Sequence, residues 1–266
     1  MTQYSFVARA DFDTIASARD YPQARASRLK RILGLGSVGF LLLLLTGCSS
    51  VTVFQSSFDS NAVGAPPSHN QATGTIDVSG APGSVVIVSA PPNATGNWAQ
   101  IQRSGGPGTP ISTMQCNFSR SPQDGTYSLL AVLYIPSGSG LATVQFNSSA
   151  QSSPPSQEIF HLDFGDIPQT ALKNTVRIND ITDNQHIFGT FTRNQFFTLA
   201  VKLEITPSSA NAHMNLYGNA SGLKDFNVVD NVHPLFLARQ FGEVRFYMGF
   251  DWHGNFDATN ILVTRK

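Results

Sequence analysis

The chain carries little charge and very little glutamate. Only 13% of its 266 residues are Asp, Glu, Lys or Arg, and 17 basic residues balance 17 acidic ones. A basic field that would attract nucleic acid is therefore absent, and we expect no nucleic-acid partner. After residue 47 the sequence holds three glutamates, Glu158, Glu204 and Glu243, so few residues are available for chemistry that needs a pair of carboxylates.

Helical periodicity and long hydrophobic runs are also scarce. Beyond about Val51, no window longer than ten residues places apolar residues convincingly at helical spacing. The apolar stretch 32–47 has 16 residues, four of them glycine, whereas a membrane-crossing helix needs about 20. Its length therefore favours the core of a cleaved signal peptide over a signal anchor or an uncleaved leader.

The flanks of this stretch complete a secretory signal. The basic residues before it are Arg25, Arg28, Lys30 and Arg31. Residues 45–48 then read Leu-Thr-Gly-Cys, which resembles the lipobox of bacterial lipoproteins: Leu, a small or polar residue, Gly or Ala, then Cys. The resemblance implies that Cys48 receives a diacylglycerol thioether, that the chain is cut before Cys48, and that the new amine is acylated.

This resemblance also implies a location. A processed lipoprotein carries three acyl chains, and stable anchoring takes more than one, so the membrane is an expected partner through the lipid. Ser49 and Ser50 follow the cysteine, where Asp would favour the inner membrane of enterobacteria. We therefore expect a lipid-anchored protein of the bacterial cell envelope, with the outer membrane favoured.

The sequence divides into three parts on these grounds. Residues 1–47 are an N-terminal extension and signal peptide, 48–57 a lipidated N-terminus with a short tether, and 58–266 a single domain. If Cys48 is lipidated, Cys116 has no cysteine to pair with, because the chain has only these two. The fold must then rest on burial alone, and we expect Cys116 to be a buried structural thiol.

The body of the chain has the pattern of strands and turns. Residues 197–205 alternate apolar and mostly polar side chains, and residues 243–251 do the same, which is typical of strands with one buried face. Glycine- and proline-rich turns separate further candidate strands at 85–89, 98–103, 111–118, 127–135, 141–146, 158–164, 175–181 and 256–264. We predict an all-β, two-sheet antiparallel β-sandwich of the jelly-roll type.

The two ends of this body resemble concanavalin A-like (laminin G-like) domains of bacteria. Residues 58–67, Phe-Asp-Ser-Asn-Ala-Val-Gly-Ala-Pro-Pro, are similar to their opening, and residues 256–263, Phe-Asp-Ala-Thr-Asn-Ile-Leu-Val, to their closing strand. The resemblance implies a jelly roll whose first and last strands lie side by side. It also implies a sugar-related role, which many members of the family have.

Catalytic motifs are not evident. Glycosidases of this fold class use two carboxylates, usually in a Glu-x-Asp-x-x-Glu strand, and the segment 158–166 has carboxylates at another spacing. Strand alternation predicts that Glu158 and Asp163 face opposite sides, whereas His161 and Asp163 share a face. That pair could do acid–base work or form an ordinary hydrogen bond, so we assign no catalytic residue.

Metal-binding patterns are equally weak. The six histidines are scattered and none has zinc-ligand spacing, so we expect no transition metal and no cofactor. The stretches 180–184 and 251–257 offer oxygen ligands in loops, which leaves a structural calcium as an alternative to ordinary turn capping.

Residues 245–255 form the most suggestive patch for a ligand. An aromatic ring stacks on the C–H face of a sugar while neighbouring acids and amides bind its hydroxyls. The candidate ligand-binding residues are Arg245, Tyr247, Asp251, Trp252, His253 and Asn255. The alternative is that Trp252 caps the core and Tyr247 covers a sheet edge.

The favoured function is binding of a surface glycan or exopolysaccharide by a lipid-anchored envelope protein. One alternative is a glycan hydrolase or lyase of the concanavalin A-like fold, so catalysis is left open although binding is favoured. The other alternative is a structural or assembly lipoprotein that recognises another protein.

Overall fold

The computed structural model describes residues 50–105, 109–149, 156–166, 172–180, 185–228, 235–249 and 253–266. Cys48 and the signal peptide expected around it lie outside these residues. Ser50–Lys266 form one compact unit, and its described part is almost entirely antiparallel β-structure. No helix in that part is long and apolar enough to span a bilayer.

The described part of the chain has fifteen strands and one short helix. Their bounds are β1 Val51–Ser56, β2 Thr75–Ser79, β3 Val85–Ser89, β4 Asn97–Arg103, β5 Thr113–Asn117, β6 Gly125–Tyr134, β7 Ala142–Ser148, β8 Glu158–Gly165, β9 Thr175–Asp180, β10 Gln185–Phe191, β11 Phe196–Ile205, β12 Ala210–Gly218, β13 Ala220–Asn227, β14 Phe241–Met248 and β15 Gly254–Arg265. The helix α1 spans Leu235–Ala238. Every strand expected from the sequence is present, and β1, β2, β10, β12 and β13 are additional.

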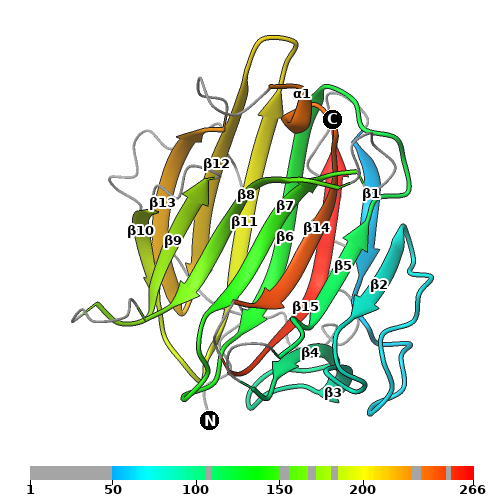
Figure 1. The fold of residues 1–266 in the computed structure, drawn as a ribbon, viewed down its shortest axis with the longest axis vertical. Coiled ribbons are helices and arrows are strands. Elements are labelled where there is room, and N and C mark those ends of the chain that lie inside the picture. Colours follow the sequence, from blue (N-terminus) through cyan, green and yellow to red (C-terminus); the bar gives the residue numbers. More distant parts are fainter. Residues whose placement is uncertain are drawn as a thin grey trace, which may run out of the picture. The chain divides into compact units, whose positions relative to one another are not determined.

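The strands are hydrogen-bonded in one continuous path that folds back into two layers. The front layer runs β2-β5-β14-β7-β8-β9, and the back layer runs β10-β13-β12-β11-β6-β15-β4-β3. Figure 1 shows β14 and β7 lying over β15 and β6, with β9, β10 and β13 at the edge where the layers join. The predicted two-sheet antiparallel sandwich is confirmed.

Two glycines allow the strands at this edge to approach closely. Gly189 of β10 is paired with Gly222 of β13. A Cβ at Gly189 would lie 2.5 Å from the carbonyl oxygen of Ser221, and one at Gly222 would lie 2.7 Å from that of Phe188. A side chain at either position would therefore push the two backbones apart.

Aromatic rings join the two layers in the core. Phe160 of β8 stacks on Phe146 of β7, with ring centres 4.3 Å apart, and lies 6.1 Å from Phe226 of β13. Tyr127 of β6 meets Phe241 of β14 edge to face at 5.1 Å.

Cys116 is also buried in the core, and its burial raises the pKa of the thiol well above its usual value. The expected buried structural thiol is present.

The first and last strands lie side by side, as the concanavalin A-like resemblance implies. β1 pairs with β15 in antiparallel register, from Val51 opposite Arg265 to Ser56 opposite Ile261. This pairing corrects one boundary, because most of the expected tether 48–57 is strand. The apolar side chains Val53 and Phe54 of β1 are buried in the core, which fixes the segment to the domain.

Candidate functional site

The outer face of the front layer is polar yet largely buried. On β7, Val144 and Phe146 point into the core, so the alternate residues point outward. The outward polar side chains that are almost fully buried are Thr143, Asn147, Asp163, Arg177, Asn179 and Glu243. Buried polar groups of this kind need hydrogen-bond partners, and here many of the partners come from neighbouring strands.

A hollow of about 580 Å³ opens on this face. Its size lies within the range of small-molecule sites. Its polar lining comes from five strands, β2, β5, β14, β7 and β8, and its apolar lining mainly from loops. The lining residues are Ser79, Ile111, Thr113, Leu141, Thr143, Gln145, His161, Asp163, Arg245, Tyr247 and Gly249. The hollow therefore combines hydroxyl, amide and charged groups with two aliphatic side chains and one phenol ring.

A β-bulge in β8 places Glu158 beside this group. Phe160 is paired with Phe146, but Glu158 is paired with the next residue of β7, Asn147, so Ile159 is an extra residue. The extra residue reverses the alternation along β8. The prediction that Glu158 and Asp163 face opposite sides is wrong, because both contact His161 on the outer face.

His161 lies between these two carboxylates. Its Nδ1 is 2.5 Å from Oε1 of Glu158, and its Nε2 is 3.5 Å from Oδ2 of Asp163. Burial by itself would lower the pKa of His161, but hydrogen bonds and charge attraction from Asp163 and Glu158 outweigh it and raise the pKa to about 10. The two carboxylates therefore favour the protonated form of His161 at neutral pH.

Asp163 is the most connected carboxylate of the group. Its Oδ1 accepts a hydrogen bond from Thr143 at 2.7 Å, and its Oδ2 accepts one from the Asn179 amide at 2.5 Å. The Arg177 guanidinium lies 3.8 Å from the same Oδ2. These contacts hold the carboxylate in one orientation.

A second network lies on β14 and its neighbours. The fully buried Glu243 accepts hydrogen bonds from Gln115 of β5 and Asn147 of β7, both at 2.9 Å. It also pairs with Nε of Arg245, whose Nη2 donates to Ser156 at 3.1 Å. Arg245 is thus positioned by both a carboxylate and a hydroxyl.

Tyr247 completes the hollow between β5 and β7. It is paired with Thr113 on one side and Thr143 on the other. Burial raises the pKa of its phenol, and the carboxylates of Glu158 and Asp163 raise it further. Tyr247 therefore stays protonated and can donate its hydroxyl hydrogen.

The structure places some of the site residues predicted from the sequence at the hollow and others away from it. Arg245 and Tyr247 line the hollow. His253 is exposed. Asn255 is the second residue of β15, and its carbonyl accepts a hydrogen bond from the Ser139 hydroxyl at 2.6 Å. Neither residue lines the hollow. Asp251 and Trp252 lie outside the described residues, as does most of the proposed calcium stretch 180–184.

Several residues of the hollow were not found from the sequence. Thr143 and Gln145 sit on β7 and Thr113 on β5, whereas His161 and Asp163 of β8 were considered as a pair but not assigned to the site. Their outward alternation with core residues was a usable signal, although it does not show which strands are neighbours. Within the described residues, no group of three or more His, Cys, Asp or Glu has a geometry that could hold a metal ion.

One further buried carboxyl lies on the back layer. Asp257 of β15 accepts a hydrogen bond from Gln100 of β4 at 3.0 Å. Burial raises its pKa to about 6, although the Gln100 hydrogen bond acts in the opposite direction. It is not among the residues that line the hollow.

Comparison with known proteins identifies the fold. No protein-family model and no curated protein matches the sequence. Among solved structures, the chain is similar to a carbohydrate esterase from the Shiga toxin-encoding bacteriophage phi24B, with a TM-score of 0.53 and 12% identity over 82% of this chain and 100% of that one. It is also similar to an endo-1,3-beta-glucanase from Streptomyces sioyaensis (TM-score 0.47, 16% identity, 82% and 97% covered) and to lectin II from Ulex europaeus (0.46, 12%, 82% and 97%). At these identities the likeness concerns the jelly-roll fold.

Proposed function

We propose that the β-sandwich binds a glycan in the hollow on the outer face of the front layer. The observation that carries this proposal is the density of fixed hydrogen-bonding groups around an aromatic ring in one concave site. Sugar hydroxyls both donate and accept, so a site for them needs both kinds of group. Gln145 and Thr143 can do both, Arg245 and His161 donate, and Asp163 accepts.

Preorganisation and charge balance support this proposal. Asp163 and Arg245 are each held by protein partners before any ligand arrives, so less side-chain freedom is lost on binding. On the described part of this face, the positive charges of Arg177, His161 and Arg245 are balanced by the negative charges of Glu158, Asp163 and Glu243. This balance favours a hydroxyl-rich, uncharged glycan over a polyanion.

Hydrolysis of a glycan is the second candidate function. It is favoured by the carboxylates of Glu158 and Asp163 on either side of His161, and by the carbohydrate-esterase and glucanase names among the similar structures. Binding is preferred because both carboxylates are already engaged, Glu158 with His161 and the two oxygens of Asp163 with Thr143 and Asn179. Release of labelled products from an oligosaccharide panel, lost in Asp163→Asn, would establish catalysis instead.

Replacing Tyr247 with alanine is expected to weaken glycan binding by roughly tenfold or more, because the sugar loses its stacking ring and a hydroxyl donor. The measurement is a glycan array followed by calorimetric titration of the best ligand. Tyr217→Ala is the matched control, since Tyr217 is a partly buried tyrosine on β12 that accepts from Asn215 and does not line the hollow. Equal losses in both variants, or no glycan bound by the parent protein, would refute the proposed site.

We also propose that a lipid on Cys48 anchors this domain at the bacterial envelope, with the outer membrane favoured. The support is the Leu-Thr-Gly-Cys sequence behind a basic and apolar leader. Cys48→Ser is expected to abolish palmitate incorporation and to leave the protein uncut or to release it from the membrane fraction. Undiminished palmitate labelling of that variant would contradict the anchor.

A further inference from the structure

The chain enters the β-sandwich very close to the proposed lipid. β1 begins at Val51, only three residues after Cys48. Three residues of extended chain span at most about 10 Å. If Cys48 carries acyl chains in the bilayer, the end of the sandwich that holds Val51 must lie close to the lipid headgroups. This inference rests on the proposed lipid anchor.

The same end of the sandwich gathers several segments that are distant in sequence. Val51 is paired with Arg265, and the backbone of Lys266 exchanges hydrogen bonds with Thr126 near the start of β6. Arg265 donates to the carbonyl of Ser121 in the loop before β6, at 3.0 Å. Figure 1 shows α1 near the C-terminal end of β15 at this end.

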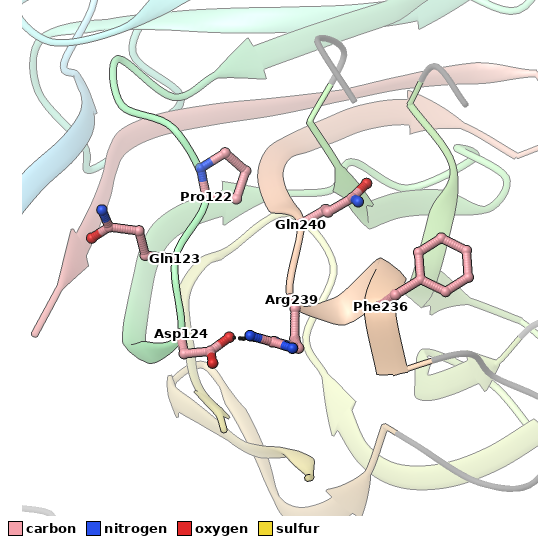
Figure 2. A pocket seen from close by; sticks show the side chains of 6 residues that line it. All are labelled: Pro122, Gln123, Asp124, Phe236, Arg239 and Gln240. Carbon is pink, nitrogen blue, oxygen red and sulfur yellow. Dashed lines mark hydrogen bonds and ion pairs between the residues drawn. The ribbon is translucent and has the colours of Figure 1, made fainter. Parts of the chain in front are cut away.

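The surface at this end has an amphipathic character. Phe236 of α1 is 49% exposed, although it is a large apolar residue. Figure 2 shows its ring pointing away from the ion pair of Arg239 and Asp124, whose atoms are 2.8 Å apart. Arg120 and Lys266 are exposed nearby. Exposed rings and long cationic side chains are the groups that settle at a membrane–water interface.

The charges at this end suit a phospholipid surface. At this end Asp124 pairs with Arg239 and Glu204 pairs with Lys202. Arg120, Arg265 and Lys266 add further positive charge. Cations within a Debye length of an anionic leaflet are attracted to it.

We propose that this end, defined by Arg120, Phe236, Arg239, Arg265 and Lys266, rests on the headgroup region of the bilayer. The phenyl ring of Phe236 inserts among the headgroups, and the cations approach the lipid phosphates. The glycan hollow then lies toward the end of the front layer that is remote from the membrane. Leu141 and Gly249 line the hollow and lie at the opposite end of the sheets. β6 starts at the proposed contact with Gly125 and reaches the far end at Tyr134, and β7 starts from that far end at Ala142.

Depth-dependent quenching of a thiol-linked fluorophore tests this orientation. The processed full-length protein is reconstituted in phosphatidylethanolamine and phosphatidylglycerol vesicles that contain a headgroup spin label. Phe236→Cys places the dye at the proposed contact. Gln195→Cys places it at the far end, in the exposed turn before Phe196, which pairs with Tyr134. Cys116 is buried and Cys48 is acylated, so the introduced thiol is the one that reacts.

We expect severalfold stronger quenching at position 236 than at position 195. Equal quenching, or stronger quenching at position 195, would overturn the orientation while leaving the anchor intact. Mass spectrometry of the same sample separates the two proposals. An N-terminus without acyl chains would overturn the anchor, and the orientation with it.

Discussion

Replacing Asp163 with alanine is expected to destabilise the sandwich by about 3–5 kcal/mol, the cost of removing one partner of a buried ion pair. Asp163 is 4% exposed and contacts Thr143, Asn179, Arg177 and His161. Without Asp163, the imidazolium of His161 keeps Glu158 as a carboxylate partner, and the buried guanidinium of Arg177 loses the carboxylate that lies 3.8 Å away. Urea unfolding followed by circular dichroism measures the loss.

The pH dependence of stability tests the same network. The folded pKa of His161 is about 10 against an ordinary value of 6.5, so its stabilising contribution is complete below pH 6.5 and is lost as the pH rises toward 10. This decline should shrink in Asp163→Ala. Asp257, with a pKa raised from 3.8 to about 6, acts in a separate window at lower pH.

Asp166→Ala provides the control for Asp163→Ala. Asp166 is more exposed and pairs with Lys173 at 3.4 Å and Arg193 at 3.5 Å, so its loss should cost at most about 1 kcal/mol. Similar losses from the two variants, or an unchanged pH profile in Asp163→Ala, would show that Asp163 does not organise this face.

Replacing Phe160 with alanine is expected to cost about 3–5 kcal/mol, because the removed ring leaves a cavity between the layers. Phe160 is fully buried and contacts Phe146 of its own layer and Phe226 of the other. The free energy of unfolding in urea is the measurement, and the cost should not depend on pH.

Phe236→Ala is the matched control for Phe160→Ala, because its ring is half exposed on α1. In detergent-free solution without vesicles its cost should stay within about 0.5 kcal/mol. Phe160→Leu should lower the free energy of unfolding less than Phe160→Ala, because the leucine side chain fills part of the cavity. A loss below 1 kcal/mol for Phe160→Ala would mean that the two layers are not joined through this ring.

The sequence by itself determined the fold class and many of its strands. Apolar residues at every second position in 197–205 and 243–251 require one buried face, whichever strands lie beside them. β12 and β13 were missed for a local reason. The buried face of β12 begins with Ala210 and Ala212, which are weak strand formers, and β13 has no fully buried residue.

Only the tertiary structure decided how the outward residues combine. Alternation placed Arg245 and Tyr247 on the outer face of β14, but it could not show that Gln115, 128 residues away, would meet Glu243 across a strand pair. Nor could it locate the bulge at Ile159, because a bulge is defined by register against the partner strand, here β7. Side-chain period is a local property of the chain, whereas strand neighbours and register depend on packing of the whole sheet, so the cluster around His161 emerges only in the folded protein.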